Sequence, residues 1–180
     1  MTKCVLVRGI GDVGSAVAHV LHREDYKVVL HDTPLPAWAR RKMAFTDAVF
    51  DGEALLAGVL ATRIDLLSTL EHMSGRTGIA VSVHDFQALL QTLQPDILID
   101  ARMRKRQTPE RQIHMAQCTI GLGPNFIAQD TTNIVIETAC AGTHNQSLWR
   151  WWTGGKIPAG RLYRRRQILF TDEEVAQISS

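Results

Sequence analysis

The chain has 180 residues, of which 45% are hydrophobic and 21% are charged. These values are close to globular averages and correspond to about one domain, so the composition excludes a disordered or a fibrous chain. The formal net charge of +2 argues neither for nor against a polyanionic partner. A basic run over 102–111 lacks interleaved aromatic residues, and we therefore expect no nucleic-acid partner.

Cysteine usage points to a reducing compartment. Cys4, Cys118 and Cys140 are an odd number at wide spacing, with no CxxC pair and no cluster at metal-ligand spacing. The pattern therefore predicts neither a disulfide framework nor a metal site. The first residues lack the features of a secretory signal, and no apolar stretch approaches the roughly 20 residues of a membrane helix. We expect a cytoplasmic protein with no membrane partner.

The first thirty-two residues predict a βαβ unit. The apolar run 4–7 is typical of a strand that is buried on both faces. Between 13 and 21, apolar residues recur at the spacing of one helix face, and a second buried strand, 28–30, ends at Asp32.

The remaining pattern extends this unit into an α/β protein. Short apolar runs around Gly52 and Gly58 predict a small β insertion at about 51–63, and Asp85 is placed to cap a helix. The other expected elements are helices over 37–50, 65–73, 86–93 and 172–178, and strands over 79–83, 97–99, 119–120, 134–136 and 161–170. The predicted fold class is α/β, a Rossmann-like, mostly parallel sheet with helices on both faces.

Two regions are expected along the chain. Residues 1–145 form the Rossmann-like domain, and residues 146–180 form a C-terminal extension packed on it. Three tryptophans crowd together near the start of that extension, at positions Trp149, Trp151 and Trp152. Such a group is typical of a satellite core or of a contact between copies of the chain.

The run from Gly9 to Gly14 matches the dinucleotide fingerprint G-x-G-x-x-G in full. In this motif Gly9 permits the tight turn, Gly11 lets the backbone approach a pyrophosphate, and Gly14 allows close helix packing. Amides at the start of the helix then face the anion. Asp32, at the end of the second strand, is placed to bind ribose hydroxyls.

Further polar residues end other parallel strands, where ligands bind in open α/β sheets. Asp12 places a carboxylate in the loop that should meet phosphate, which an arginine or a cation would have to offset. Glu137 and His144 are the candidates for proton transfer, and no catalytic residue is assigned. The predicted cofactor-binding residues are Gly9, Gly11, Asp12, Gly14, Asp32, Asp100, Arg102, Gly121 and Gly123.

The order of segments resembles the selenium-dependent molybdenum hydroxylase accessory proteins, which contain a Rossmann fold and are grouped with the maturation machinery of xanthine dehydrogenase-like enzymes. The residues that carry the resemblance are Val5-Leu6-Val7-Arg8-Gly9, Gly11-Asp12, Ala18-His19, Leu21-His22-Arg23, Pro36, Arg40-Arg41, Ala44-Phe45, Ala48-Val49, Asp51-Gly52-Glu53, Pro95-Asp96, Asp100-Ala101-Arg102, Ile120 to Phe126, Val135-Ile136-Glu137-Thr138 and Gly142 to Asn145. After Asn145 the family continues with a glycine-rich segment, whereas residues 146–152 here are rich in tryptophan.

The resemblance implies an accessory factor that matures or supplies a molybdenum hydroxylase and handles a nucleotide-bearing cofactor. The implied partner is the hydroxylase or its maturation machinery. The candidate cofactors are NAD(P) and a nucleotide form of the molybdenum cofactor. Two alternatives remain open. The chain could be an NAD(P)-dependent oxidoreductase, or it could be a non-catalytic interaction module in which the tryptophans form the contact. That contact could also join copies of this chain in a homo-oligomer.

Overall fold

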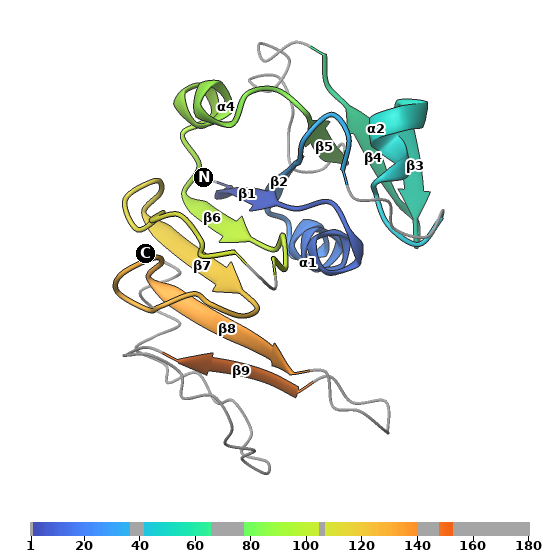
Figure 1. The fold of residues 1–180 in the computed structure, drawn as a ribbon. Coiled ribbons are helices and arrows are strands. Elements are labelled where there is room, and N and C mark those ends of the chain that lie inside the picture. Colours follow the sequence, from blue (N-terminus) through green and yellow to red (C-terminus); the bar gives the residue numbers. More distant parts are fainter. Residues whose placement is uncertain (1, 37–41, 66–77, 105–106, 140–147, 153–180) are drawn as a thin grey trace.

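The computed structural model describes residues 2–36, 42–65, 78–104, 107–139 and 148–152, the last of these and 137–139 for the backbone alone. Its helices and strands alternate along the chain (Figure 1). In chain order they are β1 Cys4–Arg8, α1 Asp12–Arg23, β2 Lys27–His31, α2 Asp47–Asp51, β3 Glu53–Leu56, β4 Val59–Arg63, β5 Ile79–Ser82, α4 Phe86–Leu93, β6 Ile97–Asp100, β7 Cys118–Leu122, β8 Ile134–Ala139 and β9 Leu148–Trp152.

The described strands form one nine-stranded sheet in the order β3-β4-β5-β2-β1-β6-β7-β8-β9. All neighbours from β4 to β8 pair in parallel, whereas β3 and β9 pair antiparallel at the two edges. The inner order β5-β2-β1-β6-β7-β8 corresponds to the strand order 3-2-1-4-5-6 of Rossmann folds. The predicted fold class is confirmed. From β1 the chain adds β2 and β5 on one side and then returns to add β6, β7 and β8 on the other, so the strand order reverses between β1 and β6.

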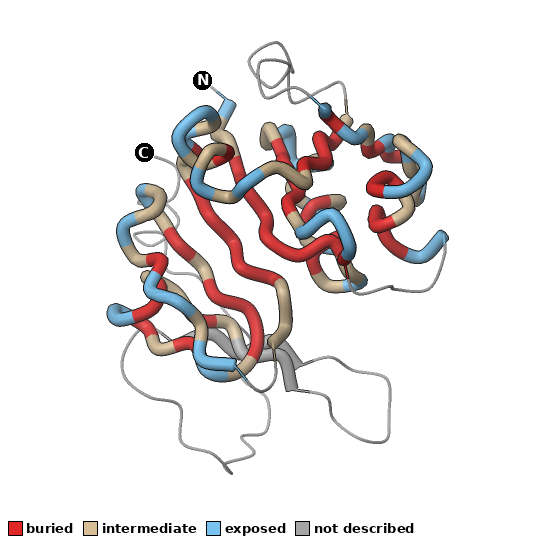
Figure 2. Tube along the Cα trace, turned by 45° about the horizontal axis from the view of Figure 1, so that its top comes forward, coloured by how far each residue is buried: buried red, intermediate tan, exposed pale blue. Residues whose placement is uncertain are grey.

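Helices cover both faces of this sheet (Figure 1). Val5 and Val7 belong to the larger core, which packs against α1 and α2, whereas Leu6 belongs to a second core under α4. Both faces of the central strands are therefore buried, which explains their unbroken apolar runs. Figure 2 shows the resulting continuous buried stretches in the middle of the sheet.

The small β insertion is present as the antiparallel hairpin of β3 and β4, in which Leu55 pairs with Leu60. The helix expected over 37–50 begins only at Asp47, and that prediction was wrong for 42–46, which form turns. Tertiary hydrogen bonds explain the difference. The Phe45 N–H donates to the Ser15 hydroxyl, and the Thr46 hydroxyl donates to the Ile10 carbonyl, so this stretch is held against the start of α1.

The structure describes the backbone of 148–152 as a strand, β9, which the sequence analysis did not predict. Residues 66–73 of the helix expected over 65–73 lie outside the described residues, as do 37–41 of the helix expected over 37–50. The elements expected over 161–170 and 172–178 also lie outside them. The division into 1–145 and 146–180 stays a prediction. No helix in the described ranges has the length and hydrophobicity needed to cross a membrane.

Candidate functional site

The glycine turn, residues 9–14, joins β1 to α1, and packing explains two of its glycines. Gly9 has a φ of +99°, and a Cβ there would lie 2.9 Å from the backbone of Ala101. A Cβ on Gly14 would lie 1.8 Å from the Gly9 carbonyl oxygen. Both positions therefore require glycine for the fold itself, because any side chain would displace main-chain atoms.

Gly11 is different. A Cβ at this position would meet nothing within 4 Å, and its φ of −69° is open to any residue. Gly11 is the N-cap of α1, a position where Ser, Thr, Asp or Asn is usually preferred, and no side-chain cap bonds the first turn. Neither backbone strain nor internal packing calls for glycine here.

Asp32 follows β2 and lies beside the glycine turn. One carboxylate oxygen accepts from the Ile10 N–H at 3.0 Å and the other from the Thr33 N–H at 2.8 Å. The residue predicted to bind ribose therefore also fixes the turn.

The predicted Asp12 carboxylate is exposed in the first turn of α1, where it adds negative charge beside the helix amides.

A buried polar row runs across the carboxyl ends of four neighbouring strands. Register pairs Ser82 with His31, His31 with Arg8, and Arg8 with Asp100. These side chains follow the apolar layer that packs under α4, and all four residues are less than a tenth exposed. The row crosses the β1–β6 switch point, where Rossmann folds bind ligands.

Arg8 ends β1 and is held on two sides. Its guanidinium lies 3.6 Å from the centre of the Phe86 ring, and Nη1 donates to Glu110 Oε1 at 2.5 Å. Its Nε is buried with no hydrogen-bond partner among the described residues. Burial lowers the pKa of Arg8, and the charge of Arg102 lowers it further.

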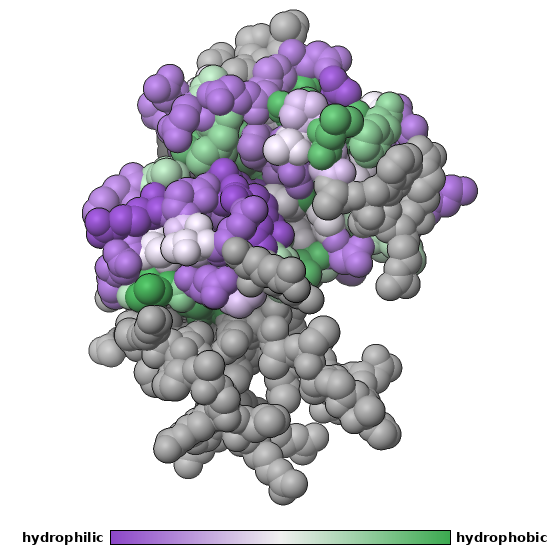
Figure 3. All heavy atoms as spheres, viewed as in Figure 1, coloured by the Kyte–Doolittle hydropathy of each residue, from purple (hydrophilic) through white to green (hydrophobic). Residues whose placement is uncertain are grey.

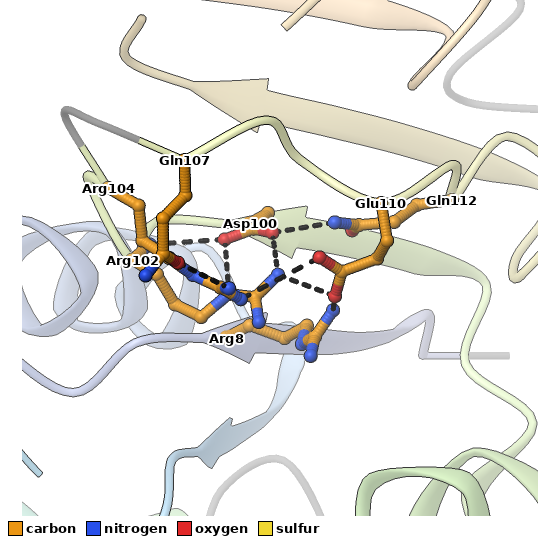
Figure 4. Close-up of polar contacts among 7 residues, drawn as sticks. All are labelled: Arg8, Asp100, Arg102, Arg104, Gln107, Glu110 and Gln112. Atoms are coloured by element: carbon orange, nitrogen blue, oxygen red, sulfur yellow. Dashed lines mark hydrogen bonds and ion pairs between the residues drawn. The ribbon is translucent and has the colours of Figure 1, made fainter. Parts of the chain in front are cut away.

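Asp100 and Arg102, both predicted site residues, bind each other. Arg102 Nε donates to Asp100 Oδ1 at 2.9 Å, its Nη2 donates to Oδ2, and the Gln112 amide also donates to Oδ2 at 2.6 Å (Figure 4). Burial alone would lower the pKa of Arg102, but hydrogen bonds to Asp100 and Glu110 outweigh it, and the pKa rises. The Asp100 carboxylate is thus fully engaged within the protein.

Glu110 joins the arginines from the segment that leads to β7. Its carboxylate accepts from Arg8 and Arg102, and Arg104 Nη2 lies 3.7 Å from Oε2. Burial opposes ionisation of Glu110, but the hydrogen bonds from Arg102 and Arg8 lower its pKa to about 2. We call Arg8, Asp100, Arg102, Arg104 and Glu110 the arginine–carboxylate cluster. Hydrophilic residues gather over β6 and β7 on the face shown in Figure 3.

His31 and His84 have structural partners. The Nε2–H of His31 donates to the His84 carbonyl at 2.9 Å, and burial lowers the pKa of His31, so the ring is neutral at neutral pH. His84 Nδ1 lies 3.1 Å from the Ser82 hydroxyl. Ser82 is fully buried, so this pair offers no accessible nucleophile.

Gly121 and Gly123 pack against neighbouring side chains. A Cβ on Gly121 would lie 2.3 Å from the Phe126 ring, and one on Gly123 would lie 2.9 Å from the Met103 sulfur. A small pocket opens nearby, lined by Asp100, Arg102, Met103, Arg104, Gln107, Pro109, Pro124 and Phe126. Because the two glycines have no Cβ, the Phe126 ring and the Met103 side chain can pack directly against the backbone at these positions, and both side chains line the pocket.

Other predicted residues are not brought to this site by the described structure. His144 lies outside the described residues, and of Glu137 only the backbone is described.

In the described ranges, no group of three His, Cys, Asp or Glu residues is arranged to hold a metal ion. Burial raises the pKa of Cys4 to about 11 and also raises that of Cys118, so both stay protonated thiols.

Sequence reasoning missed Arg8, Glu110 and Gln112. Arg8 did carry a signal, because a charged residue ends an otherwise apolar strand just before the glycine turn. The signal for Glu110 is absent from its neighbourhood in the sequence, since its partners Arg8 and Arg102 lie 102 and 8 residues away.

Comparisons with known proteins give one curated relative, "uncharacterized protein YqeB" of Escherichia coli (strain K12). It is 37% identical to this chain over 136 residues, which are 76% of this chain. The chain spans about a quarter of the length of that relative, 25%. No family model matches the chain, and no solved structure matches it. The chain is a homologue of YqeB over most of its own length and has a Rossmann-like α/β fold.

Proposed function

We propose that this chain is the nucleotide-binding module of an accessory or maturation factor for a molybdenum-containing hydroxylase. The observation that carries nucleotide binding is Gly11, which neither φ nor packing requires. A glycine at this point of the turn is accounted for if a phosphate group approaches the backbone there. The uncapped first turn of α1 then supplies amide donors and a favourable helix dipole.

Asp32 supports a nucleoside rather than a bare phosphate as the ligand. Its carboxylate oxygens each accept one backbone hydrogen bond and retain lone pairs for ribose hydroxyls. Asp12 works against phosphate in the first turn, so binding requires that the exposed carboxylate turn toward solvent or meet a cation. The role in hydroxylase maturation rests on the ordered family resemblance of residues 5–145.

Nucleotide binding is tested by the melting temperature of the full chain with NAD, NADP, ATP and CTP. A ligand that binds only the folded state raises the melting temperature. Gly11→Val should abolish the rise because its side chain fills the approach to the turn. Ala16→Val, on the exposed face of α1, adds the same kind of bulk and should keep it. An equal rise in Gly11→Val would contradict this proposal.

The maturation role is tested separately in cells that lack the chain and express a molybdenum hydroxylase. The expected result is a smaller fraction of active hydroxylase, restored by the wild-type chain and by Ala16→Val but not by Gly11→Val. Full hydroxylase activity without the chain would remove the maturation role and leave nucleotide binding untouched.

An NAD-dependent oxidoreductase is the second candidate, favoured by the Rossmann strand order and by the acid at the end of β2. Asp32 would favour NAD over NADP, because its charge repels a 2′-phosphate. Hydride transfer from NADH to a small acceptor would support this candidate. Binding of NAD without turnover would favour the maturation factor, and no response to any nucleotide would favour an interaction module.

A further inference from the structure

The side chain of Glu110 has an unusual position for a residue outside helices and strands. It is 41% exposed, yet its two carboxylate oxygens face the guanidinium groups of three arginines. Arg8 approaches Oε1 at 2.5 Å, Arg102 at 2.8 Å, and Arg104 approaches Oε2 at 3.7 Å. A planar carboxylate held by several arginine N–H groups resembles the way proteins bind free carboxylate and phosphate ions.

The charges around Glu110 do not cancel. Three guanidinium groups face two carboxylates, which leaves one positive charge in the arginine–carboxylate cluster. If the Glu110 side chain turned out toward solvent, Asp100 alone would oppose the three arginines and the excess would be two positive charges. A phosphate dianion would compensate this excess fully, whereas Glu110 compensates half of it.

We propose that Arg8, Arg102 and Arg104 form a binding site for a phosphate group, and that Glu110 occupies this site when phosphate is absent. Glu110 would leave by rotation toward solvent, which its exposure allows. No covalent bond is made or broken in this exchange. The phosphate group replaces the Glu110 carboxylate as the partner of the arginines.

The arginines are prepared for such a ligand. Arg8 is fixed against the Phe86 ring, and Asp100 fixes Arg102 through two hydrogen bonds, so little side-chain freedom remains to be lost on binding. Arg8 also keeps a buried Nε without a partner among the described residues. Asp100 binds Arg102 and is itself held by the Gln112 amide, and neither side chain need contact the anion (Figure 4).

This site is separate from the proposed nucleotide site at Gly11. The Arg8 side chain contacts Phe86 of α4, whereas the glycine turn leads into α1 on the opposite face of the sheet. The inference therefore does not depend on the proposed function. Gly11→Val should leave phosphate binding at the arginines unchanged, so failure of either proposal can be recognised independently.

The test is calorimetric titration of the full chain with inorganic phosphate at constant ionic strength, because added salt screens charge. Glu110→Gln should bind phosphate about tenfold more tightly than the wild type, equivalent to about 1.4 kcal/mol. Adding Arg104→Gln to that variant should reverse the gain. Glu53→Gln removes the same charge from an exposed site on β3 and should behave as the wild type. A parallel titration with a nucleoside monophosphate distinguishes a phosphate ester from free phosphate.

Glu110→Asp provides a second measurement in case Glu110→Gln does not fold. It keeps the negative charge but withdraws the carboxylate by one methylene, so phosphate should again bind more tightly than to the wild type. Circular dichroism checks that each variant is folded. The proposal is overturned if the folded Glu110 variants bind phosphate no more tightly than the wild type and Glu53→Gln.

Discussion

The glycine turn and the arginine–carboxylate cluster both begin at the end of β1, but their polar groups are satisfied in different ways. In the turn, Gly11 is open and the first turn of α1 has no side-chain cap. In the cluster, Asp100 is engaged by Arg102 and Gln112 within the protein. The comparison shows that the end of one strand can lead to an open backbone site toward one face of the sheet and to a closed charged cluster on the other.

Substitutions in the arginine–carboxylate cluster should lower the free energy of unfolding more than substitutions in the glycine turn. Asp100→Asn removes the more buried of the two carboxylates that bind Arg102 and leaves only the partly exposed Glu110. Loss of one member of a buried pair costs about 3–5 kcal/mol, and we expect the lower end of this range because Glu110 remains. Urea unfolding followed by circular dichroism measures this loss. Glu53→Gln, an exposed change of the same charge, should stay within about 0.5 kcal/mol of the wild type. A loss below 1 kcal/mol for Asp100→Asn would show that the cluster contributes little, on the scale of exposed ion pairs.

Substitution of two glycines in the turn should change the free energy of unfolding by very different amounts. Gly14→Ala drives a methyl group into the Gly9 carbonyl and should lower the free energy of unfolding by about 3 kcal/mol. Gly11→Ser enters open space at an N-cap and should change it by less than about 0.5 kcal/mol. The same unfolding experiment measures both variants. Equal losses at the two positions would contradict the conclusion that internal packing requires glycine at position 14 but not at position 11.

The turn also depends on the segment that precedes α2. Thr46→Val removes the hydroxyl that donates to Ile10 and should cost about 1 kcal/mol, since Ser15 still donates to the same carbonyl. Thr92→Val removes an exposed hydroxyl that donates to Ala88 and serves as the control, with an expected change below about 0.5 kcal/mol. Equal changes in the two melting curves would indicate that the segment is not held by this contact.

The smallest expected effect is on acid stability. The pKa of Glu110 is lowered from 4.5 in the unfolded chain to about 2 in the folded one. Its stabilising contribution is therefore complete above pH 4.5 and is lost as the pH falls through 2. Melting temperatures measured from pH 5 to 2 should show the difference between wild type and Glu110→Gln shrinking over this interval. A difference that stays constant would mean that the arginines do not hold the ionised carboxylate.

The sequence predicted the parallel core well because its signals are local. Apolar runs, the glycine turn and the Asp85 cap each lie within a few residues, and Asp85 does accept from the Gln87 and Ala88 N–H groups. The start of α2 was predicted incorrectly because Phe45 and Thr46 bond to residues 30 or more positions away. Local helix periodicity carries no information about such contacts.

The candidate site was predicted only in its outline for the same reason. Glycine spacing identified Gly9, Gly11 and Gly14 together, but the structure is needed to separate the two that packing requires from the one that it does not. Asp100 and Arg102 were recognised by their place after a strand. Their mutual engagement, and the contact of Glu110 with Arg8, depend on how the segment after β6 folds back.

The polar row at the strand ends also bears on how the sheet finds its alignment. The central parallel strands are apolar on both faces, so hydrophobicity alone would tolerate sliding one strand along the next. A two-residue slide of β1 against β6 would place Arg8 beyond the carboxylate of Asp100 or beside Leu98. Either arrangement would move Arg8 away from Glu110, which follows β6 in the chain and binds the Arg8 guanidinium, and would leave the buried charge of Arg8 without this partner. The charged strand ends thus raise the free energy of sheets with a shifted register and favour the native alignment during folding.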